Sequence, residues 1–296
     1  MSEKKFRSGF VAILGRPNVG KSSIMNRIVG EKVAIDSNHP QTTRNKLLGV
    51  ATGPDWQIVF VDTPGLHKPR TKLGEYMMKS ASDAREGVDA VLAVVDGQRI
   101  GGGDKAVLSD IQSMNCPRFL AVNKIDIVPP EKLMPQLAEL NEFHFDQIFS
   151  VSARTGENID LLTQKLIEAM PEGPKYFPDD MITDQPERVM CAEIIREKAL
   201  NNLRDEIPHG VGVEMLQIKK LSDNLTEIHA NVYCEKESHK SIIIGKQGAM
   251  LGRIGSQARV DIERLLGTKV MLKLWVKVRL DWRNRAGDLR TLGYED

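Results

Sequence analysis

The chain has few cysteines and no cysteine motif. Cys116, Cys191 and Cys234 are the three cysteines in 296 residues, and no two of them have the C-x-x-C spacing. An odd, scattered set does not build a disulfide framework, and the missing spacing removes the usual ligand pair of a zinc site. We therefore expect reduced, mostly buried thiols and no catalytic cysteine.

Long apolar runs are also missing. No stretch approaches the length that spans a bilayer, and the opening residues MSEKKFRSGF contain no apolar core of a signal peptide. We expect a cytoplasmic protein, and a peripheral contact with the inner face of the cell membrane stays open. Apolar residues make up 41% and charged residues 27%, as in globular proteins, and a chain of 296 residues is long enough for two domains.

The net charge of +1 hides an asymmetry along the chain. Residues 239–290 contain twelve Lys and Arg against four Asp and Glu, a net of +8, which leaves −7 for the rest. A basic C-terminal region indicates a polyanionic partner at that end. A solvated basic face without a partner is the alternative on charge alone.

Short apolar runs alternate with helical patterns from residue 8 to about residue 170. Several runs are apolar at consecutive positions, as in strands that are buried on both faces of a parallel sheet. This order predicts a doubly wound, mostly parallel α/β domain over residues 1–172, with its ligand at the carboxyl ends of the strands. The predicted strands are FVAILG, LLGVAT, QIVFVDT, AVLAVVD, RFLAVNK and QIFSVSA.

A change of pattern separates this domain from the rest of the chain. Four prolines fall within PEGPKYFPDDMITDQPE, so we expect residues 173–187 to form a linker or an ordered strap between domains. Residues 188–296 then read as α-β-β-α-α-β, which predicts a smaller α+β domain that ends in a basic tail.

A phosphate-binding loop is predicted at residues 15–22, GRPNVGKS, between a strand and a helix. Its glycines let backbone N–H groups turn toward phosphates, Lys21 reaches the β- and γ-phosphates, and the Ser22 hydroxyl ligates Mg²⁺. A plain glycine-rich turn is the alternative, which the flanking strand and helix disfavour. The predicted nucleotide contacts are Gly15, Arg16, Pro17, Asn18, Val19, Gly20, Lys21, Ser22 and Ser23.

The tetrapeptide DTPG ends the strand QIVFVDT. Asp62 supplies a carboxylate for the Mg²⁺ shell, and the N–H of Gly65 can sense the γ-phosphate. On its own this motif is weak, because a turn has the same composition. The predicted contacts here are Asp62, Thr63, Pro64, Gly65 and Leu66.

Two further motifs predict the base. Asp126 in NKID can accept from the N1 and N2 donors of guanine, an edge that adenine lacks, so the nucleotide is expected to be GTP. Backbone N–H groups of SAR, beginning at Ser152, can contact the guanine O6. Four motifs in this order at four strand ends make a chance match improbable. The residues assigned to the base are Asn123, Lys124, Ile125, Asp126, Ser152 and Ala153.

With these motifs the chain resembles the translation-factor class of P-loop GTPases, and GRPNVGKSS, QTTR and DTPGL are similar to the subfamily that holds Era, MnmE and Der. The resemblance implies that Thr42 or Thr43, with Thr43 preferred, meets Mg²⁺ beside Ser22 and Asp62. Leu66 stands where Ras-type GTPases have the glutamine that orients water. The resemblance implies instead that Asn18 helps to hold K⁺, a cation that can stabilise the transferring phosphoryl group; a simple turn role for Asn18 is the alternative. The catalytic candidates are Lys21, Thr43 and Asn18.

The second domain contains IIIGKQG at residues 242–248, a glycine-x-x-glycine loop with Lys246 between its glycines. Such a loop approaches phosphates closely in KH modules, which clamp about four nucleotides. A second match, GRIG at 252–255, lies inside the following helix and is disfavoured. We expect Met250, Leu251, Ile254, Ala258, Ile262, Leu265 and Leu266 in the core, with Arg253 and Arg259 outward. The predicted RNA contacts are Lys240, Ile243, Gly245, Lys246, Gln247, Gly248 and Arg253.

The α-β-β-α-α-β order resembles a type II KH domain, and one GTPase domain followed by one KH domain is the arrangement of the Era family. The resemblance implies a monomeric GTP-hydrolysing switch that binds the 3′ end of small-subunit ribosomal RNA and assists assembly of that subunit and maturation of its RNA. Two alternatives stay open: an RNA-binding assembly factor with GTP as a structural ligand, and a membrane-associated cell-cycle GTPase. Trp275 and Trp282 could stack on bases, but Trp275 alternates with apolar residues and is expected in the core.

Overall fold

The computed structural model describes residues 5–35, 44, 47–62, 87–204 and 207–294. These described residues form two compact units that divide between Asp184 and Gln185. Each unit has its own sheet and hydrophobic core, and each is described by itself. Among the helices within the described ranges, none is long and apolar enough to cross a membrane.

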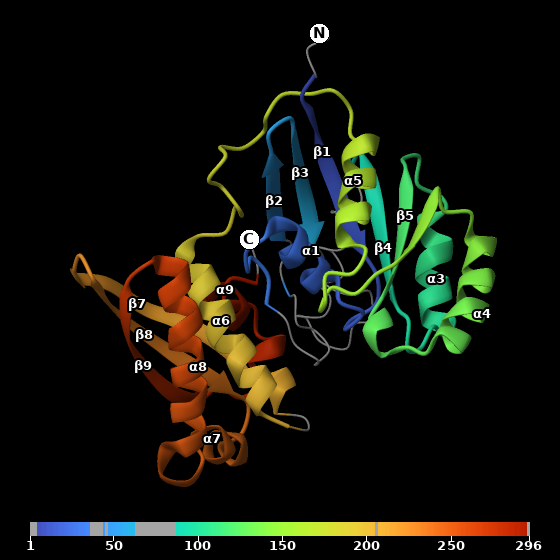
Figure 1. The fold of residues 1–296 in the computed structure, drawn as a ribbon. Helices are drawn as coiled ribbons and strands as arrows, with labels where there is room; N and C mark the ends of the chain where they lie inside the picture. Colours follow the sequence, from blue (N-terminus) through green and yellow to red (C-terminus); the bar gives the residue numbers. More distant parts are fainter. Residues whose placement is uncertain (1–4, 36–43, 45–46, 63–86, 205–206, 295–296) are drawn as a thin grey trace. The chain divides into compact units, whose positions relative to one another are not determined.

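The first unit is built on a six-stranded sheet with the order β2-β3-β1-β4-β5-β6 (Figure 1). All neighbours pair in parallel except β2 and β3, which are antiparallel. The predicted doubly wound, mostly parallel sheet is therefore confirmed, with an antiparallel strand at one edge. The strands are β1 (Arg7–Leu14), β2 (Leu47–Gly53), β3 (Trp56–Asp62), β4 (Ala90–Asp96), β5 (Arg118–Asn123) and β6 (Gln147–Ser150).

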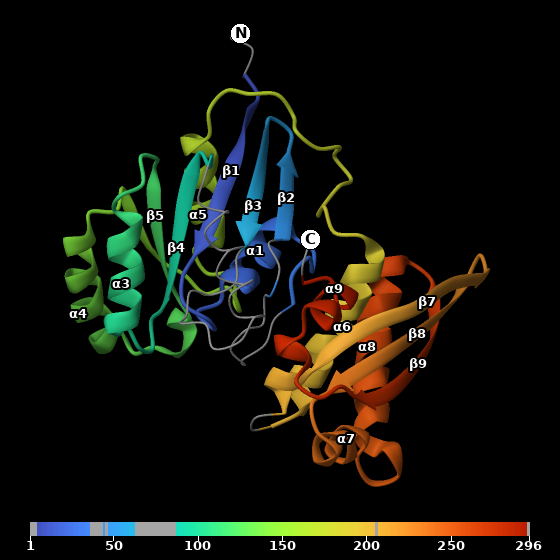
Figure 2. The same ribbon diagram turned by 180° about the vertical axis from the view of Figure 1, so that it is seen from behind.

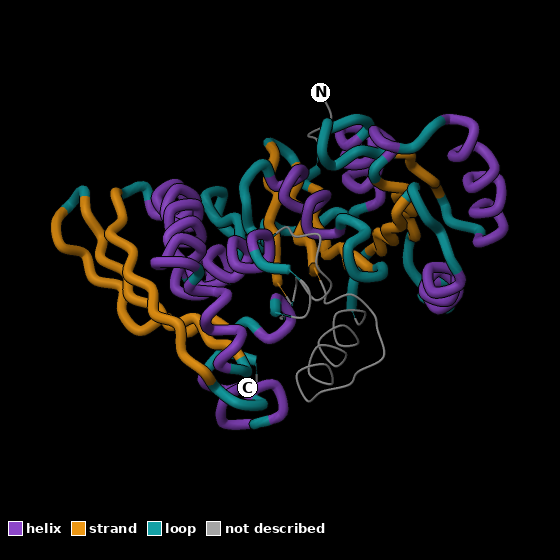
Figure 3. The backbone as a smooth tube through the Cα atoms, turned by 90° about the horizontal axis from the view of Figure 1, so that it is seen from below, coloured by secondary structure: helices purple, strands orange, loops and turns teal. Residues whose placement is uncertain are grey.

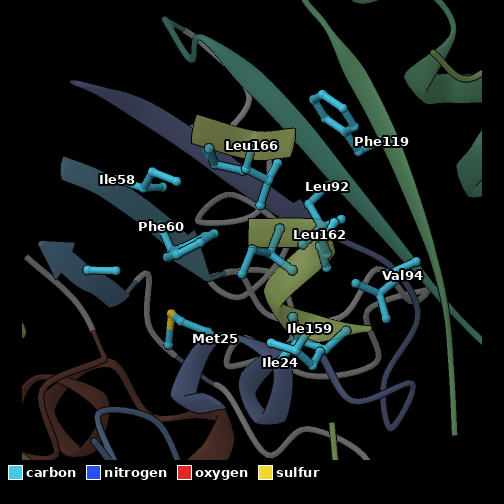
Figure 4. Close-up of a cluster of buried hydrophobic side chains, with 14 of the residues drawn as sticks. Ile24, Met25, Ile58, Phe60, Leu92, Val94, Phe119, Ile159, Leu162 and Leu166 are labelled. Carbon is cyan, nitrogen blue, oxygen red and sulfur yellow. The ribbon is translucent and has the colours of Figure 1, made fainter. Parts of the chain in front are cut away.

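Helices cover both faces of this sheet, which explains why its strands are apolar at consecutive positions. The core of one face joins α1 and α5 to the strands, and Figure 4 shows Met25 of α1 and Leu162 of α5 gathered with Phe60 of β3 and Leu92 of β4. The core of the opposite face contains Leu108 and other side chains of α3 and α4. The helices are α1 (Lys21–Val29), α3 (Gly102–Ile111), α4 (Pro130–Leu140) and α5 (Ile159–Ala169).

The proline-rich segment before Gln185 is an ordered strap that runs along the first unit. Gln57, the second residue of β3, is fully buried. Its side chain accepts hydrogen bonds from the N–H groups of Tyr176 (2.8 Å) and Phe177 (2.9 Å) and donates to the Phe177 carbonyl (2.9 Å). Farther along, the Val50 N–H donates to the Ile182 carbonyl at 2.8 Å. The strap thus pairs with the edge strand β2.

The second unit has the predicted order α-β-β-α-α-β. Its three-stranded sheet has the order β7-β8-β9, antiparallel between β7 and β8 and parallel between β8 and β9. Helices α6 and α8 pack on one face, and the other face is turned toward the viewer in Figure 2. The elements are α6 (Glu187–Asn202), β7 (Gly212–Ser222), β8 (Leu225–Cys234), α7 (Glu237–Ile244), α8 (Ala249–Leu266) and β9 (Lys269–Val278).

The C-terminal residues fold onto the second unit, which corrects the expectation of a basic tail. Trp282 is fully buried, its indole Nε1 donates to the Gly210 carbonyl at 2.9 Å, and its ring stacks with that of Tyr294. A short helix, α9 (Ala286–Thr291), completes this segment. The burial of Trp282 also excludes it from stacking on a base.

The three cysteines are free thiols, as expected. Cys191 and Cys234 are buried and Cys116 is half-buried. Burial raises the pKa of Cys191 to about 12, so this thiol stays neutral at physiological pH.

Candidate functional sites

The loop between β1 and α1 has the geometry of a phosphate cradle. At Gly20, φ is +97°, and a Cβ there would overlap the side-chain nitrogen Nδ2 of Asn123. At Gly15, a Cβ would overlap the Val94 carbonyl of the neighbouring strand. Both positions therefore require glycine, because the backbone lies too close to its neighbours for any side chain. The backbone N–H groups of this loop lie directly before the N-terminus of α1, the usual arrangement for binding phosphate.

The ammonium group of Lys21 lies inside this loop. It donates to the carbonyl oxygens of Gly15 (3.3 Å) and Arg16 (3.1 Å), and the side chain is only 6% exposed. Burial lowers the pKa of Lys21, and the Asp62 carboxylate opposes that shift. A buried cation held by weak neutral acceptors is placed to pair with an incoming phosphate.

Ser22 and Asp62 come together at the end of the loop. The Ser22 hydroxyl donates to Asp62 Oδ2 at 2.6 Å, and both side chains are buried. A hydroxyl and a carboxylate are the hard oxygen ligands that Mg²⁺ takes alongside phosphate oxygens and waters, so the residues present fit this ion. Elsewhere in the described residues, no group of three or more His, Cys, Asp or Glu could hold a metal.

Asn123 joins the phosphate loop to the loop that follows β6, the last strand of the sheet. Its Nδ2 donates to the Val19 carbonyl at 2.9 Å, and its Oδ1 accepts from the Ala153 N–H at 3.0 Å. The side chain is buried, so both bonds are shielded from water. Three of the four predicted motifs are thus held together by one amide.

Lys124 makes a second connection. Its Nζ donates to the Asn18 carbonyl (2.8 Å) and forms an ion pair with Asp96 Oδ2 (2.6 Å) at the end of β4. Asn18 has a φ of +66°, so the turn role considered for it is present in the structure. Asp96 was missed by the sequence analysis, although its place at the carboxyl end of a parallel strand was a usable signal.

The carboxylate of Asp126 is held in place beside the last predicted motif. The Ser152 hydroxyl donates to Asp126 Oδ1 at 2.7 Å and itself accepts from the Thr155 N–H at 3.1 Å. The Arg154 guanidinium lies 3.8 Å from Asp126 Oδ2. Ser152 therefore orients the carboxylate that is predicted to read guanine.

The remaining predicted contacts surround these residues. Arg16 is exposed and forms an ion pair at 3.3 Å with the buried Asp104 of α3. Pro17 is half-buried in the loop, Ser23 lies in the first turn of α1, and Ile125 begins a short 3₁₀ helix. Outside the described residues lie Thr42, Thr43, Thr63, Pro64, Gly65 and Leu66.

The glycine-x-x-glycine loop of the second unit connects α7 to α8. Gly245 has a φ of +73°, and a Cβ there would clash with Met250; Gly248 has a φ of +81° at the start of α8. Between them, Lys246 and Gln247 are exposed, and the first turn of α8 contains no acidic residue. A tight, open loop before a helix N-terminus fits close approach of a phosphate.

One predicted RNA contact is wrong. Ile243 is fully buried in the core of the second unit, so its side chain cannot contact RNA. Its neighbour Ile242 is 50% exposed and offers an apolar contact instead. Arg253 and Arg259 are exposed on α8 as predicted, and Lys240 on α7 is partly exposed, 3.7 Å from Glu237.

The expectation that Trp275 lies in the core is also wrong. Its side chain is 43% exposed on β9, whereas Leu274 and Val276, on either side, face the core. Successive side chains of a strand point to opposite faces, so alternation with apolar residues placed Trp275 outside.

Comparison with known proteins agrees with this architecture. A family profile described as a 50S ribosome-binding GTPase matches residues 10–124, and one described as a KH domain matches residues 206–283. The GTPase Era of Alkaliphilus metalliredigens is 53% identical over 293 residues, 98% of this chain and 99% of that protein.

Two solved structures are similar over almost the whole chain. One is Era in complex with MgGDPNP and nucleotides 1506–1542 of 16S ribosomal RNA, with 39% identity and a TM-score of 0.91 over 98% of this chain and 100% of that one. The other is a variant of Aquifex aeolicus Era bound to GDP and AlF₄⁻, with 38% identity, the same TM-score and the same coverage.

Proposed function

The chain belongs to the Era family of GTPases, and we propose that it is a GTP-hydrolysing switch whose KH domain binds the 3′ end of small-subunit ribosomal RNA and assists assembly of that subunit. The observation that carries the nucleotide part is the convergence of three of the four predicted motifs on the buried amide of Asn123. A cytoplasmic monomer remains our expectation.

Guanine selectivity rests on Asp126. Its carboxylate, oriented by Ser152, can accept two hydrogen bonds from guanine, whereas adenine presents no such pair of donors. Replacing Asp126→Asn should cost about 2–4 kcal/mol of guanine preference. Xanthine nucleotides provide the matched probe, because their 2-oxo group accepts a hydrogen bond that the new amide can donate. Equal affinity of the native protein for ATP and GTP in a competition assay would overturn the assignment.

Magnesium fits the Ser22 and Asp62 pair. When bound, Mg²⁺ neutralises charge on the phosphate oxygens as the γ-phosphoryl group is transferred. Lys21 adds its own positive charge from within the loop. Replacing Ser22→Ala should weaken GTP binding in Mg²⁺ and change little in EDTA, which isothermal titration in the two buffers can measure.

A further part of the proposal is that Asn18 helps to hold K⁺ during GTP hydrolysis. Asn18 lies in the phosphate loop with its carbonyl held by Lys124, and an amide oxygen suits a monovalent cation. We expect faster GTP turnover, and tighter capture of aluminium fluoride with GDP, in K⁺ than in Na⁺. The variant Asn18→Gly keeps the positive φ but removes the amide, so it should lose the K⁺ effect. Equal behaviour in both salts at matched ionic strength would refute this route.

RNA binding is assigned to the loop between α7 and α8. Replacing Lys246 and Gln247 with Asp places two carboxylates where phosphates must approach, so RNA affinity should collapse. The control Lys132→Asp reverses one exposed charge on α4 of the other unit and should leave RNA binding intact. The RNA probe is the segment bound by the solved relative, nucleotides 1506–1542 of 16S ribosomal RNA.

The proposal that the protein is a nucleotide-dependent switch requires more than binding of both GTP and RNA. GTP and GDP must give different RNA affinities, because a ligand without differential affinity for two states shifts neither. If neither ligand changes the affinity for the other, GTP is a structural ligand of an assembly factor. A contact of the basic region with anionic lipid is tested separately, by flotation with phosphatidylglycerol vesicles.

A further inference from the structure

The outer face of the β7-β8-β9 sheet combines an exposed aromatic ring with lysines. Helices α6 and α8 pack on the inner face, and Figure 3 shows them on one side of the strands. Along β9, Val270, Leu272, Leu274, Val276 and Val278 belong to or pack against the core. The opposite set of side chains, Met271, Lys273, Trp275 and Lys277, is exposed on the outer face.

The ring of Trp275 packs against a histidine of the neighbouring strand. It lies 5.3 Å from the imidazole of His229 on β8, at 79° between the ring planes. In an edge-to-face pair at least one face of the indole is left uncovered by the imidazole. The imidazole Nε2 of His229 is in turn 3.1 Å from Glu227 Oε1, and the imidazole side chain is itself largely buried. A flat, oriented aromatic face is therefore available on the surface of a rigid strand.

The charges around this ring are net positive. Lys273 and Lys277 lie two residues away on either side of Trp275, and both are exposed on its face. The carboxylate of Glu227 is paired with Lys273 at 2.7 Å and with His229. Across the sheet, Lys219 lies opposite Glu227 in the strand register and adds another exposed cation.

The second carboxylate on this face is also engaged. Glu214 Oε2 accepts from the Tyr233 hydroxyl (2.5 Å) and from Asn231 Nδ2 (3.1 Å). Arg279 stacks over the Tyr233 ring at 4.1 Å and donates to its hydroxyl. Both acidic groups are thus satisfied within the protein, Glu227 by its pair with Lys273, and Lys219 and Lys277 are left to face an anion.

We propose that this outer face of the KH sheet is a second site for single-stranded RNA, in which a base stacks on Trp275 while Lys277 contacts an adjacent phosphate and Lys273 neutralises Glu227. The inference rests on the proposed RNA-binding function. Base stacking combined with a basic surface is the usual mode of sequence-tolerant single-strand binding. A protein partner fits less well, because interface cores are depleted in lysine and the indole here stands between two of them.

Tryptophan emission provides a direct test. The chain has three tryptophans; Trp282 is buried and Trp56 lies on β3 of the other unit, so Trp275 is the one that can stack on RNA. Titration with single-stranded oligoadenylate of about 20 nucleotides, long enough to reach beyond the KH loop, should quench this emission. The quenching should disappear in Trp275→Phe, which keeps an aromatic ring. Quenching that persists in this variant would contradict the proposal.

Affinity measurements with the same oligonucleotide complete the test. Trp275→Ala should weaken binding about 5- to 150-fold, while Trp275→Phe should stay within about threefold of the native protein. Met271→Ala is the matched control, because it removes an exposed apolar side chain from the same face of the same strand. Lys277→Gln should reduce the salt slope of binding by about one. Native affinity in both Trp275→Ala and Lys277→Gln would refute the second site.

The outcomes separate this inference from the function on which it rests. If the Lys246 and Gln247 double variant loses RNA while Trp275→Ala does not, only the second site fails. If neither changes RNA binding, the RNA function itself fails. If Trp275→Ala weakens association with purified small ribosomal subunits but not with naked RNA, the face binds a protein and the RNA assignment is wrong.

Discussion

Removing the Asn123 side chain tests whether one buried amide organises the nucleotide site. Asn123→Ala leaves the Val19 carbonyl and the Ala153 N–H without the partners they have at 2.9 and 3.0 Å. Each buried polar group that loses its partner costs about 1–3 kcal/mol, and relaxation of the loops recovers part of it. We therefore expect a total loss of about 2–4 kcal/mol, which corresponds to about 30- to 1,000-fold in affinity if it falls on binding.

The assay is fluorescence anisotropy with a labelled GDP, paired with urea unfolding of the nucleotide-free protein. The two together capture the loss whether it falls on binding or on stability. Asn202→Ala is the control, because it also removes an amide with two hydrogen bonds, to the Lys198 carbonyl and to Gln257, but in the second unit. If Asn123→Ala binds GDP within about threefold of the native protein and unfolds at the same urea concentration, the reasoning is wrong.

Three further predictions follow from local geometry. Gly20→Ala should weaken GDP binding more than tenfold, because the new Cβ overlaps the side chain of Asn123. Gly30→Ala is the control: Gly30 also has a positive φ but open space around it, so this variant should lose only about 1 kcal/mol of stability and no affinity for GDP. Gln57→Leu should destabilise the protein by about 2–4 kcal/mol in urea, since three hydrogen bonds to the strap are lost. The pKa of the Cys191 thiol is raised to about 12, so the folded protein keeps this proton at pH values where the unfolded chain has lost it, and the free energy of unfolding should fall as pH rises from about 9 to 12. At pH 8 a thiol reagent should modify Cys191 only after unfolding. Rapid reaction of all three thiols in the native protein would contradict this.

The phosphate site could be predicted from the sequence because its constraints are local. The spacing of Gly15, Gly20, Lys21 and Ser22 is fixed by one loop between one strand and one helix, and close packing admits only glycine at two positions. Asp62, Asn123 and Ser152 were found for a different reason. Parallel strands end at one edge of the sheet, so residues at strand ends converge whatever their distance along the chain.

The error at Trp275 was avoidable. Along β9 the tryptophan is separated by even numbers of residues from Lys269, Lys273 and Lys277, so it shares a face with lysines and not with Leu274. In a strand, the residues two positions away share a face with the tryptophan, and its direct neighbours lie on the opposite face. The prediction for Trp275 relied on the direct neighbours. At Ile243 no such signal existed, because a run of three isoleucines hides which one faces the core.

The position of the strap along the first unit could not be predicted from local sequence patterns, although Gln57 gave one indication of it. Three prolines (Pro171, Pro174 and Pro178) interrupt its periodicity, and its hydrogen bonds reach residues more than a hundred positions away, so no spacing along the chain encodes them. Gln57, however, lies within the apolar run QIVFVD, and a side-chain amide buried there must find partners. One partner is a side chain of the neighbouring strand, since Gln57 Nε2 donates to Thr52 Oγ1 at 3.0 Å. The others are backbone groups that the sheet does not already pair, and they come from an irregular segment lying along the strand. A polar residue in a buried strand therefore predicts a covering segment, and here that segment is the chain that leads to the second unit.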